Sequence, residues 1–278
     1  MKEKLFVSFS GGRTSAFMCW WLKTNMAHKY EMLFVFANTG QEHENTLRFV
    51  DECDRFWGLD VVWVEAVTHY NQRRGCTHKV VDFASASRDG APFEDVIKKY
   101  GIPNKSYPHC TRELKLNPMY SYVDSVWGEC DYKVAVGIRS DEQGRRSTAD
   151  KRIVYPLIDW CPTDKADITD WWEDQEFSLE LPERLGNCTW CWKKSDKKLL
   201  LNAATNPEIF AFPARMEALY PDRGSQAGGL RVFFRQRRST EQILAMAREV
   251  CPDTRYLERA SENSGCSESC EAFLAAVQ

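Results

Sequence analysis

The 278-residue chain lacks long hydrophobic runs, which limits where it can reside. No segment approaches the roughly 18 uncharged apolar residues of a membrane span. The opening MKEKLFVSFSGG also carries no apolar stretch followed by a small-residue cleavage site. We therefore expect a cytoplasmic protein with no membrane partner.

The chain also lacks a marked excess of charge of either sign. Its formal net charge is -3 and its isoelectric point is near 6.0, so it has no overall attraction to nucleic acid or to an anionic membrane. Any such binding must be local. Internal repeats and low-complexity tracts are missing as well, and nothing in the composition indicates an oligomeric state.

Cysteine, by contrast, is abundant. Eleven cysteines, an odd number, occur in a chain without an export signal. Such cysteines are better interpreted as thiols and metal ligands than as a disulfide framework. Their spacing therefore carries information.

The hydrophobic pattern of the first 160 residues predicts an α/β fold with a parallel sheet covered by helices. Strands are expected at residues 5–9, 32–37, 60–64 and 133–138, and helices at residues 15–23, 44–57 and 112–127. Residues 69–107 lose this periodicity, apart from a short helix over 93–100, and predict a loop-rich lid. The sheet is expected to end near residues 155–160.

The composition changes after Trp160, where strand patterns stop and cysteines pair up. We therefore predict two regions, a nucleotide-binding domain over 1–160 and a mostly helical, cysteine-containing region over 161–278. Helices in the second region are expected at residues 196–204, 207–219 and 240–250.

A glycine-rich loop connects the first predicted strand to the first predicted helix. It reads Ser10-Gly11-Gly12-Arg13-Thr14-Ser15. Backbone N–H groups at a helix N-terminus bind anions, and glycines permit close approach of a phosphate. A glycine turn without any ligand is the alternative. The Walker and dinucleotide fingerprints are both absent, so the loop predicts another class of nucleotide site.

Five segments together resemble a known family. They are SFSGGRTS, VFANTGQEHENT at 35–46, CTRELKLNP at 110–118, GIRSDEQGRR at 137–146 and YPLIDW at 155–160. In this order they resemble the N-type ATP pyrophosphatases and the related phosphoadenosine phosphosulfate (PAPS) reductases, over about residues 4–175. The family's loop is usually Ser-Gly-Gly-x-Asp-Ser, and Thr14 stands here in place of the aspartate.

The resemblance implies a Rossmann-like sheet of the adenine nucleotide alpha hydrolase type, with helices on both faces. It implies ATP or a related adenylyl nucleotide and Mg²⁺ as cofactors, with the phosphates at Ser10 to Ser15. Asn38 and Thr39 would lie near the nucleotide. Lys115, Arg139 and Arg146 would face anionic groups of the substrate, which suits their charge. A solvated charge cluster is the alternative for the arginines.

Two cysteine pairs predict a metal site. Cys188-Thr-Trp-Cys191 and Cys266-Ser-Glu-Ser-Cys270 have spacings typical of zinc or iron ligands. Cys110 precedes Cys188 by 78 positions, and this distance resembles the cluster pattern of iron-sulfur adenylylsulfate reductases. That resemblance implies a [4Fe-4S] cluster on Cys110, Cys188, Cys191 and either Cys266 or Cys270. Zinc on the two pairs and a metal-free protein remain alternatives.

The tail NSGCSESCEAF lacks the Glu-Cys-Gly-x-His motif of thioredoxin-dependent sulfonucleotide reductases. The sequence therefore favours adenylation of a substrate with release of pyrophosphate. Reduction of PAPS or adenylylsulfate is one alternative, and a non-catalytic module that binds nucleotide and metal is another.

Iron-sulfur relatives in the family include tRNA thiolases and DNA phosphorothioation enzymes, which implies sulfur transfer to a nucleic acid and a sulfur-donor protein as partner. Two basic segments fit this hypothesis, because cations contact phosphates and aromatic rings stack on bases. They comprise Lys193, Lys194, Lys197 and Lys198, and Arg231, Arg235, Arg237 and Arg238 with Phe233 and Phe234. Ordinary solvated helix faces are the alternative.

Overall fold

A computed structural model describes residues 2–147, 149–224 and 229–250. Its centre is one six-stranded sheet in the order β4-β3-β2-β1-β5-β6, in which β4 alone runs antiparallel to its neighbour. The strands are β1 (Glu3–Ser8), β2 (Tyr30–Ala37), β3 (Val62–Val67), β4 (Thr77–Val81), β5 (Lys133–Ala135) and β6 (Ile153–Val154). The predicted α/β class with a mostly parallel sheet is confirmed.

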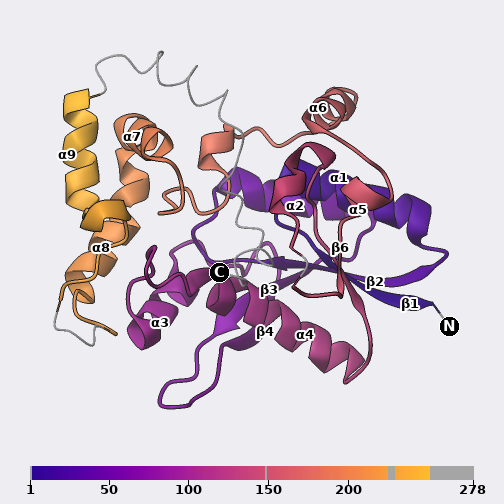
Figure 1. Ribbon diagram of the computed structural model, residues 1–278, viewed down its shortest axis with the longest axis horizontal. Helices are drawn as coiled ribbons and strands as arrows, with labels where there is room; N and C mark the ends of the chain where they lie inside the picture. Colours follow the sequence, from indigo (N-terminus) through magenta and orange to yellow (C-terminus); the bar gives the residue numbers. More distant parts are fainter. Residues whose placement is uncertain (1, 148, 225–228, 251–278) are drawn as a thin grey trace.

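Helices cover both faces of this sheet (Figure 1). Alternate residues of β1 point to opposite sides, as the strand repeat requires. Leu5 and Val7 lie in a core with residues of α1 (Arg13–Met26), α2 (Glu44–Trp57) and α6 (Lys165–Glu173). Phe6 lies in a second core with residues of α4 (Asn117–Trp127). Every residue of β1 from Leu5 to Ser8 is therefore buried.

The segment predicted as a loop-rich lid contains β4 and α3 (Ala91–Tyr100). The pattern missed β4 because this edge strand has little hydrophobic alternation, and Val80 is exposed. Its position is fixed by pairing with β3 and by the ion pair of Lys79 with the fully buried Glu65, whose atoms lie 2.9 Å apart. Pairing between strands is a tertiary feature that a local pattern does not contain.

Residues 112–127 were expected to form one helix, but they form a π-helical turn, η1 (Arg112–Leu116), followed by α4. The backbone N–H of Asn117 donates to the carbonyl of Arg112, five residues earlier. Pro118 follows at once and has no N–H to donate. The wider turn lets the chain continue through the proline, and such turns are frequent at functional sites.

No strand follows β6 in the described part of the chain, as expected. The later elements are α5 (Pro156–Asp159), η3 (Glu183–Leu185), α7 (Asp196–Thr205), η4 (Pro207–Phe210), α8 (Ala211–Leu219), η5 (Arg235–Arg237) and α9 (Thr240–Val250), and η2 (Ser140–Arg145) precedes them. None of the described helices is long and apolar enough to cross a membrane.

Residue 160 does not separate two independent cores. The indole of Trp172 in α6 lies 5.1 Å from the ring of Phe49 in α2, inside the first core. Farther along the chain, the ring of Trp190 lies 5.5 Å from that of Phe93 in α3. This contact belongs to a third core shared by α3, α7, α8 and α9, which lie together in Figure 1. The helical region is thus built onto the sheet region at two places.

Candidate functional site

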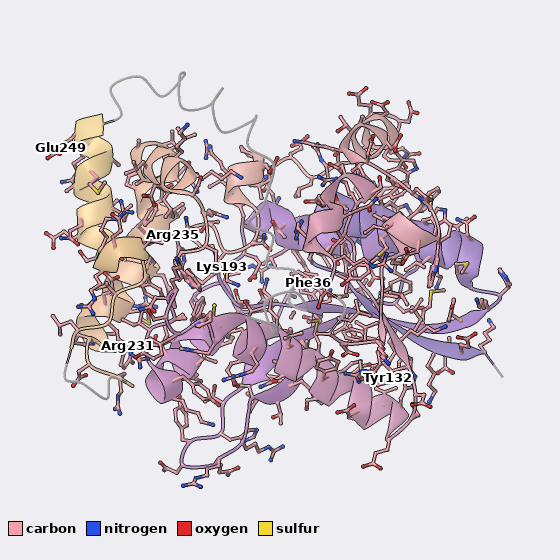
Figure 2. The ribbon with its side chains drawn as sticks, in the orientation of Figure 1. Phe36, Tyr132, Lys193, Arg231, Arg235 and Glu249 are labelled. Carbon is pink, nitrogen blue, oxygen red and sulfur yellow. The ribbon has the colours of Figure 1, made fainter. Side chains whose placement is uncertain are left out.

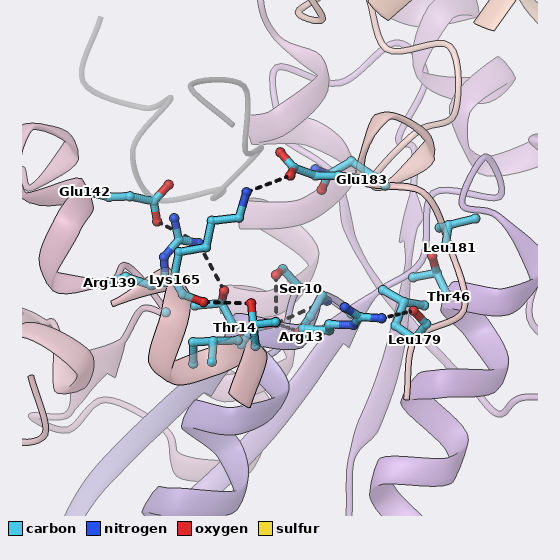
Figure 3. A pocket seen from close by; sticks show the side chains of 18 of the residues that line it. Ser10, Arg13, Thr14, Thr46, Arg139, Glu142, Lys165, Leu179, Leu181 and Glu183 are labelled. Carbon is cyan, nitrogen blue, oxygen red and sulfur yellow. Dashed lines mark hydrogen bonds and ion pairs between the residues drawn. The ribbon is translucent and has the colours of Figure 1, made fainter. Parts of the chain in front are cut away.

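A pocket of about 290 Å³ lies where the strand order reverses. The chain proceeds from β1 to β2 on one side, whereas β5 pairs with the other edge of β1. Ligands of open α/β sheets bind beyond the carboxyl ends of the strands at such a point. All six residues of the Ser10 to Ser15 loop line the pocket, together with Gly137 and Arg139 that follow β5 (Figure 3).

The phosphate loop is held in shape by its own hydroxyls. Ser15 donates to the carbonyl of Gly12 over 2.9 Å, and Ser10 donates to Ser15 over 2.9 Å. Gly11 has a φ of 79°, and a Cβ there would lie 2.8 Å from Cγ2 of Thr46. A Cβ on Gly12 would meet no atom within 4 Å. The loop is therefore packed against α2 at Gly11 and open at Gly12.

Cationic side chains form one wall of the pocket. The side chain of Arg139 is 14% exposed, and its guanidinium lies 2.8 Å from Asp141 and 3.4 Å from the hydroxyl of Thr14. Burial opposes the charge of Arg139, but the hydrogen bond with Asp141 and the charge of Glu142 outweigh it and raise the pKa of Arg139. Arg145 pairs with Glu142, and its buried Nη2 has no hydrogen-bond partner among the described residues.

An ion pair crosses the rim of the pocket. Nζ of Lys165, at the start of α6, lies 3.5 Å from a carboxylate oxygen of Glu183, and Figure 3 shows this pair across the pocket from Ser10 and Thr14. The remaining wall is apolar and is lined by Ile168, Leu179, Leu181 and Pro182. The pocket thus combines a polar floor, cations and an apolar side.

Arg13 is the loop residue that points away from the cationic wall (Figure 3). Its Nη2 donates to the carbonyl of Leu179 over 2.9 Å. The indole N–H of Trp172 donates in turn to the carbonyl of Arg13 over 3.1 Å. Arg13 therefore joins the loop to the apolar wall and to α6, although the sequence predicted a direct contact with phosphate.

The other predicted nucleotide residues lie outside this pocket. Asn38 is fully buried and donates to Glu65 and to the carbonyl of Ser87 over 2.7 and 2.9 Å. Arg146 forms an ion pair with Asp159 over 3.0 Å and does not line the pocket. Asn38 and Arg146 thus contact neighbouring protein groups.

Thr39 and Lys115 line a second, smaller cavity of about 20 Å³. Cys110, Cys188 and Cys191 line the same cavity, although 81 positions separate the first from the last. The hydroxyl of Thr39 lies 3.6 Å from Sγ of Cys188, and Nζ of Lys115 lies 3.7 Å from the carboxylate of Glu42. Cys266 and Cys270 lie outside the described residues.

The two cavities are neighbours along one loop. Gly186 and Asn187 line the larger pocket, and the next residue, Cys188, lines the cysteine cavity. Cys188 is also anchored to the segment after β2 by a backbone bridge to Glu42. A change of conformation in this loop would therefore affect both cavities.

The donor sets fit the predicted metals only in part. Within residues 2–147, 149–224 and 229–250, no group of three or more histidine, cysteine or acidic side chains is arranged to hold a metal ion. Three thiols in one cavity are one short of the four ligands of a [4Fe-4S] cluster. For Mg²⁺, which prefers carboxylate oxygens, the pocket lining offers Glu142 and Glu183, and both are paired with cations.

Several lining residues were missed by the sequence interpretation. Thr46 lies in the quoted segment 35–46, but nothing in the sequence placed it in the site. The structure shows that Thr46 lines the pocket and that its buried hydroxyl has no hydrogen-bond partner among the described residues. Lys165 and Glu183 come from beyond residue 160 and belong to none of the quoted segments. Only the packing of α6 and η3 against the loop brings them to the pocket.

The basic segments predicted to contact nucleic acid are largely used inside the protein; Figure 2 labels Lys193, Arg231 and Arg235 of these segments. Lys194 is buried and donates to the carbonyl of Gly186 over 2.7 Å. Arg231 is buried with its guanidinium over the ring of Tyr107. Phe233 and Phe234 are buried in the third core, so the prediction that they stack on bases is wrong. Lys197, Arg235 and Arg237 remain exposed.

No model of a protein family matches the chain. It is 34% identical over 275 residues to the uncharacterized nin region protein ORF290 of Escherichia phage lambda, and the alignment covers 96% of this chain and 94% of the phage protein. The chain therefore belongs to the family of this phage protein.

Two proteins of Methanocaldococcus jannaschii are similar over a shorter stretch. The uncharacterized protein MJ0066 is 29% identical over 153 residues, which are 55% of this chain and 26% of that protein. The uncharacterized protein MJ0973 is 24% identical over 166 residues, which are 56% of this chain and 33% of that protein.

Proposed function

We propose that the pocket at the switch point binds ATP or a related adenylyl nucleotide, with the phosphates on the loop from Ser10 to Ser15. The observation that carries this proposal is the combination of an open loop at a helix N-terminus with a cationic wall. Gly12 presents bare backbone to the pocket, while Arg139, Arg145 and Lys165 surround it. Backbone N–H groups and guanidinium groups are the usual partners of phosphate oxygens.

The rest of the pocket suits the other end of a nucleotide. The apolar wall of Ile168, Leu179, Leu181 and Pro182 offers a surface for a flat base. The volume of about 290 Å³ is close to the lower bound of roughly 300 Å³ for small-molecule sites. The ion pair of Lys165 with Glu183 lies at the rim, where its opening would admit a larger ligand.

The reaction that these groups favour is adenylyl transfer. An acceptor oxygen forms a bond to the α-phosphorus, the bond from that phosphorus to the bridging oxygen breaks, and pyrophosphate leaves with the electron pair. Negative charge grows on the departing pyrophosphate, where the loop N–H groups and Arg139 lie. Preorganised donors of this kind lower the barrier by electrostatic stabilisation. The resemblance to the ATP pyrophosphatases supports the same reaction.

The test measures ATP affinity by calorimetry and identifies the products as AMP and pyrophosphate or as ADP and phosphate. Gly12→Asp should weaken ATP binding at least about tenfold, because a Cβ at this position meets no protein atom within 4 Å and the added carboxylate repels the phosphates that the proposal places on the loop. The matched control is Gly12→Asn, which has nearly the same shape and no charge. Equal affinity of Gly12→Asp and the wild type, with both proteins folded, would remove the loop assignment.

Two other functions remain as candidates. The cysteine cavity beside the pocket favours sulfur chemistry, either displacement of the adenylate by sulfur or reduction of a sulfonucleotide. Release of sulfite from PAPS in the presence of a thiol reductant would identify the reductase. Tight ATP binding without any pyrophosphate release would instead identify a non-catalytic nucleotide-binding module.

A further inference from the structure

A second charged cavity, of about 370 Å³, lies on the other side of η1 from the cysteines. It is bounded by the loop between β3 and β4, the end of α3 and the first residues of η1. We infer that this cavity, here called the basic groove, binds the phosphate backbone of a nucleic acid. The inference deepens the proposed function, because it names nucleic acid as the class of acceptor. It rests on the proposed function in one respect, since the group to be transferred would be activated in the nucleotide pocket.

The groove concentrates positive charge on a protein whose net charge is negative. Four cations line it, namely Arg73, Arg74, Lys99 and Arg112, against the single carboxylate of Glu113. The local balance is thus 4 minus 1, or +3, in a chain whose formal charge is -3. Such a concentration of one sign attracts a ligand of the opposite sign and raises its association rate.

The groove is built by buried contacts and is more than a chance gathering of surface charges. Glu113 is 2% exposed, and its carboxylate accepts the N–H of Cys76 over 3.0 Å, Nε of Arg112 over 2.8 Å and Nδ2 of Asn117 over 3.1 Å. These bonds join the loop, η1 and α4. The charge of Glu113 is therefore used to hold the walls together.

The far wall is fixed in a similar way. Nζ of Lys99 and the hydroxyl of Tyr100 both donate to the carbonyl of Arg74, over 2.6 and 3.3 Å. Gly75 packs so closely on Asn117 that a Cβ would lie 2.4 Å from Nδ2. The loop that carries Arg73 and Arg74 is thus anchored at its base, while both arginines remain exposed. A loop whose backbone is already fixed loses less freedom when a ligand binds.

The lining favours a polymer of phosphates over a single nucleotide. Apart from Tyr100, the groove is lined by polar and charged residues and by Gly75, so it offers no apolar wall for a buried base. Cations from three separate elements can contact successive phosphates of one strand. Tyr70, in the same loop, exposes 44% of its surface and can stack on an unpaired base.

The position of η1 connects this groove to the cysteine cavity. Cys110 and Thr111 line the cavity, and the next two residues, Arg112 and Glu113, line the groove. Arg112 directs Nε to Glu113 and exposes 58% of its side chain. A strand held by Arg112 would therefore contact the same η1 segment that borders the cysteine cavity.

The experiment measures fluorescence anisotropy of labelled single-stranded DNA and RNA of roughly 16 nucleotides, with the full chain and without ATP. The double variant Arg73→Ser and Arg74→Ser should lose at least about tenfold in affinity and show a shallower salt dependence, because two phosphate contacts disappear. The matched control is Arg48→Ser with Arg55→Ser on α2, two arginines whose side chains are each 66% exposed. This control should retain the wild-type affinity.

Three results would overturn the inference. The first is that the wild-type protein binds no oligonucleotide at low salt. The second is that the groove variant and its control lose the same amount of affinity. The third is that the groove variant binds oligonucleotides as the wild type does and loses only the binding of anionic lipid vesicles. The failure of this inference is distinguishable from failure of the proposed function. Gly12→Asp should weaken ATP binding and leave oligonucleotide binding intact, whereas the groove variant should do the reverse.

Discussion

At the scale of single residues, the two glycines of the phosphate loop serve different purposes. Gly11 combines a positive φ with a backbone that packs against Thr46. We predict that Gly11→Ala lowers the free energy of unfolding by roughly 1–3 kcal/mol, because the side chain meets both strain and a steric clash. Gly12→Ala is the control and should change stability by less than about 0.5 kcal/mol. Urea unfolding of the two variants measures the difference, and equal stabilities would contradict the geometry.

Glu113 offers a residue-scale prediction that depends on pH. Burial works against its charge, but the N–H of Cys76 and the guanidinium of Arg112 outweigh burial and hold the pKa of this carboxyl below its ordinary value of 4.5. A carboxylate with a lowered pKa stabilises the folded state above the unfolded pKa, and this stabilisation is lost as the pH falls below it. We predict that Glu113→Gln costs roughly 1–3 kcal/mol at pH 7.

The cost of Glu113→Gln should shrink as the pH falls below about 4.5, because the unfolded wild-type chain then takes up a proton at this carboxyl while the folded chain, with its lowered pKa, does not. Urea unfolding at pH 7 and at about pH 4 measures both values. The control is Glu129→Gln, which replaces an exposed carboxylate. A cost for Glu113→Gln that is the same at both pH values would show that charge is not what Glu113 contributes.

At the scale of elements, the sequence predicted what depends on local pattern. Both α2 and α9 were predicted with their observed bounds, since each has a clear amphipathic repeat, and the phosphate loop follows β1 as expected. The edge strand β4 and the π-helical turn η1 were missed. The first depends on pairing with β3, and the second on how the buried Pro118, which has no N–H, is accommodated at the start of α4.

For the candidate site too, the sequence predicted the residues that occur in local motifs and missed those that only packing brings together. The loop residues and Arg139 were predicted because they occur in recognisable segments, and they line one pocket. Lys165 and Glu183 were not predicted, because they reach the pocket only through the packing of later elements. The sequence could supply the list of motifs, but not which buried neighbour each side chain would contact.

Helix α6 carries an element-scale prediction. Its residues Ile168 and Trp172 belong to the first core, and Trp171 packs at 4.8 Å from Trp20 of α1. A chain ending at residue 160 would expose the surface of α1 and α2 that α6 covers. We predict that residues 1–160 alone form aggregates or a state without fixed packing, whereas a chain ending at residue 250 is soluble.

The measurement for this prediction is the near-ultraviolet circular dichroism and the denaturant unfolding of both truncated chains. A chain ending at residue 160 that unfolds cooperatively at the same denaturant concentration as the longer one would contradict the shared core. It would instead support an independent nucleotide-binding domain over 1–160.

At the scale of the whole molecule, the cysteines connect distant parts of the chain. We predict that Cys110→Ser, Cys188→Ser and Cys191→Ser each reduce the bound iron or zinc per chain, as does substitution of Cys266 or Cys270. The reason is that a metal site loses affinity when one thiolate ligand is removed. Metal and sulfide counts with an anaerobic absorption spectrum measure the effect, and Cys130→Ser, at an exposed position, is the control.

The possible outcomes distinguish the three hypotheses for the metal. Full occupancy in Cys110→Ser, with both pairs essential, would indicate zinc held by Cys188, Cys191, Cys266 and Cys270. If all five cysteines were dispensable for metal content, the cavity would have no metal and the sulfur-transfer candidate would lose its main support.

The strand order has a consequence for how the protein is made. Val7 of β1 lies between Phe34 of β2 and Ala135 of β5, and the first core also includes Leu179. On the ribosome, β1 is synthesised first, but its second neighbour emerges more than a hundred residues later. Helices α1 and α2 emerge early and cover one face of β1 and β2, but the face that carries Phe6 and the edge of β1 that pairs with β5 stay uncovered until α4 and β5 have emerged. Ribosome-bound chains of this protein should therefore be substrates for chaperones until α6 has emerged.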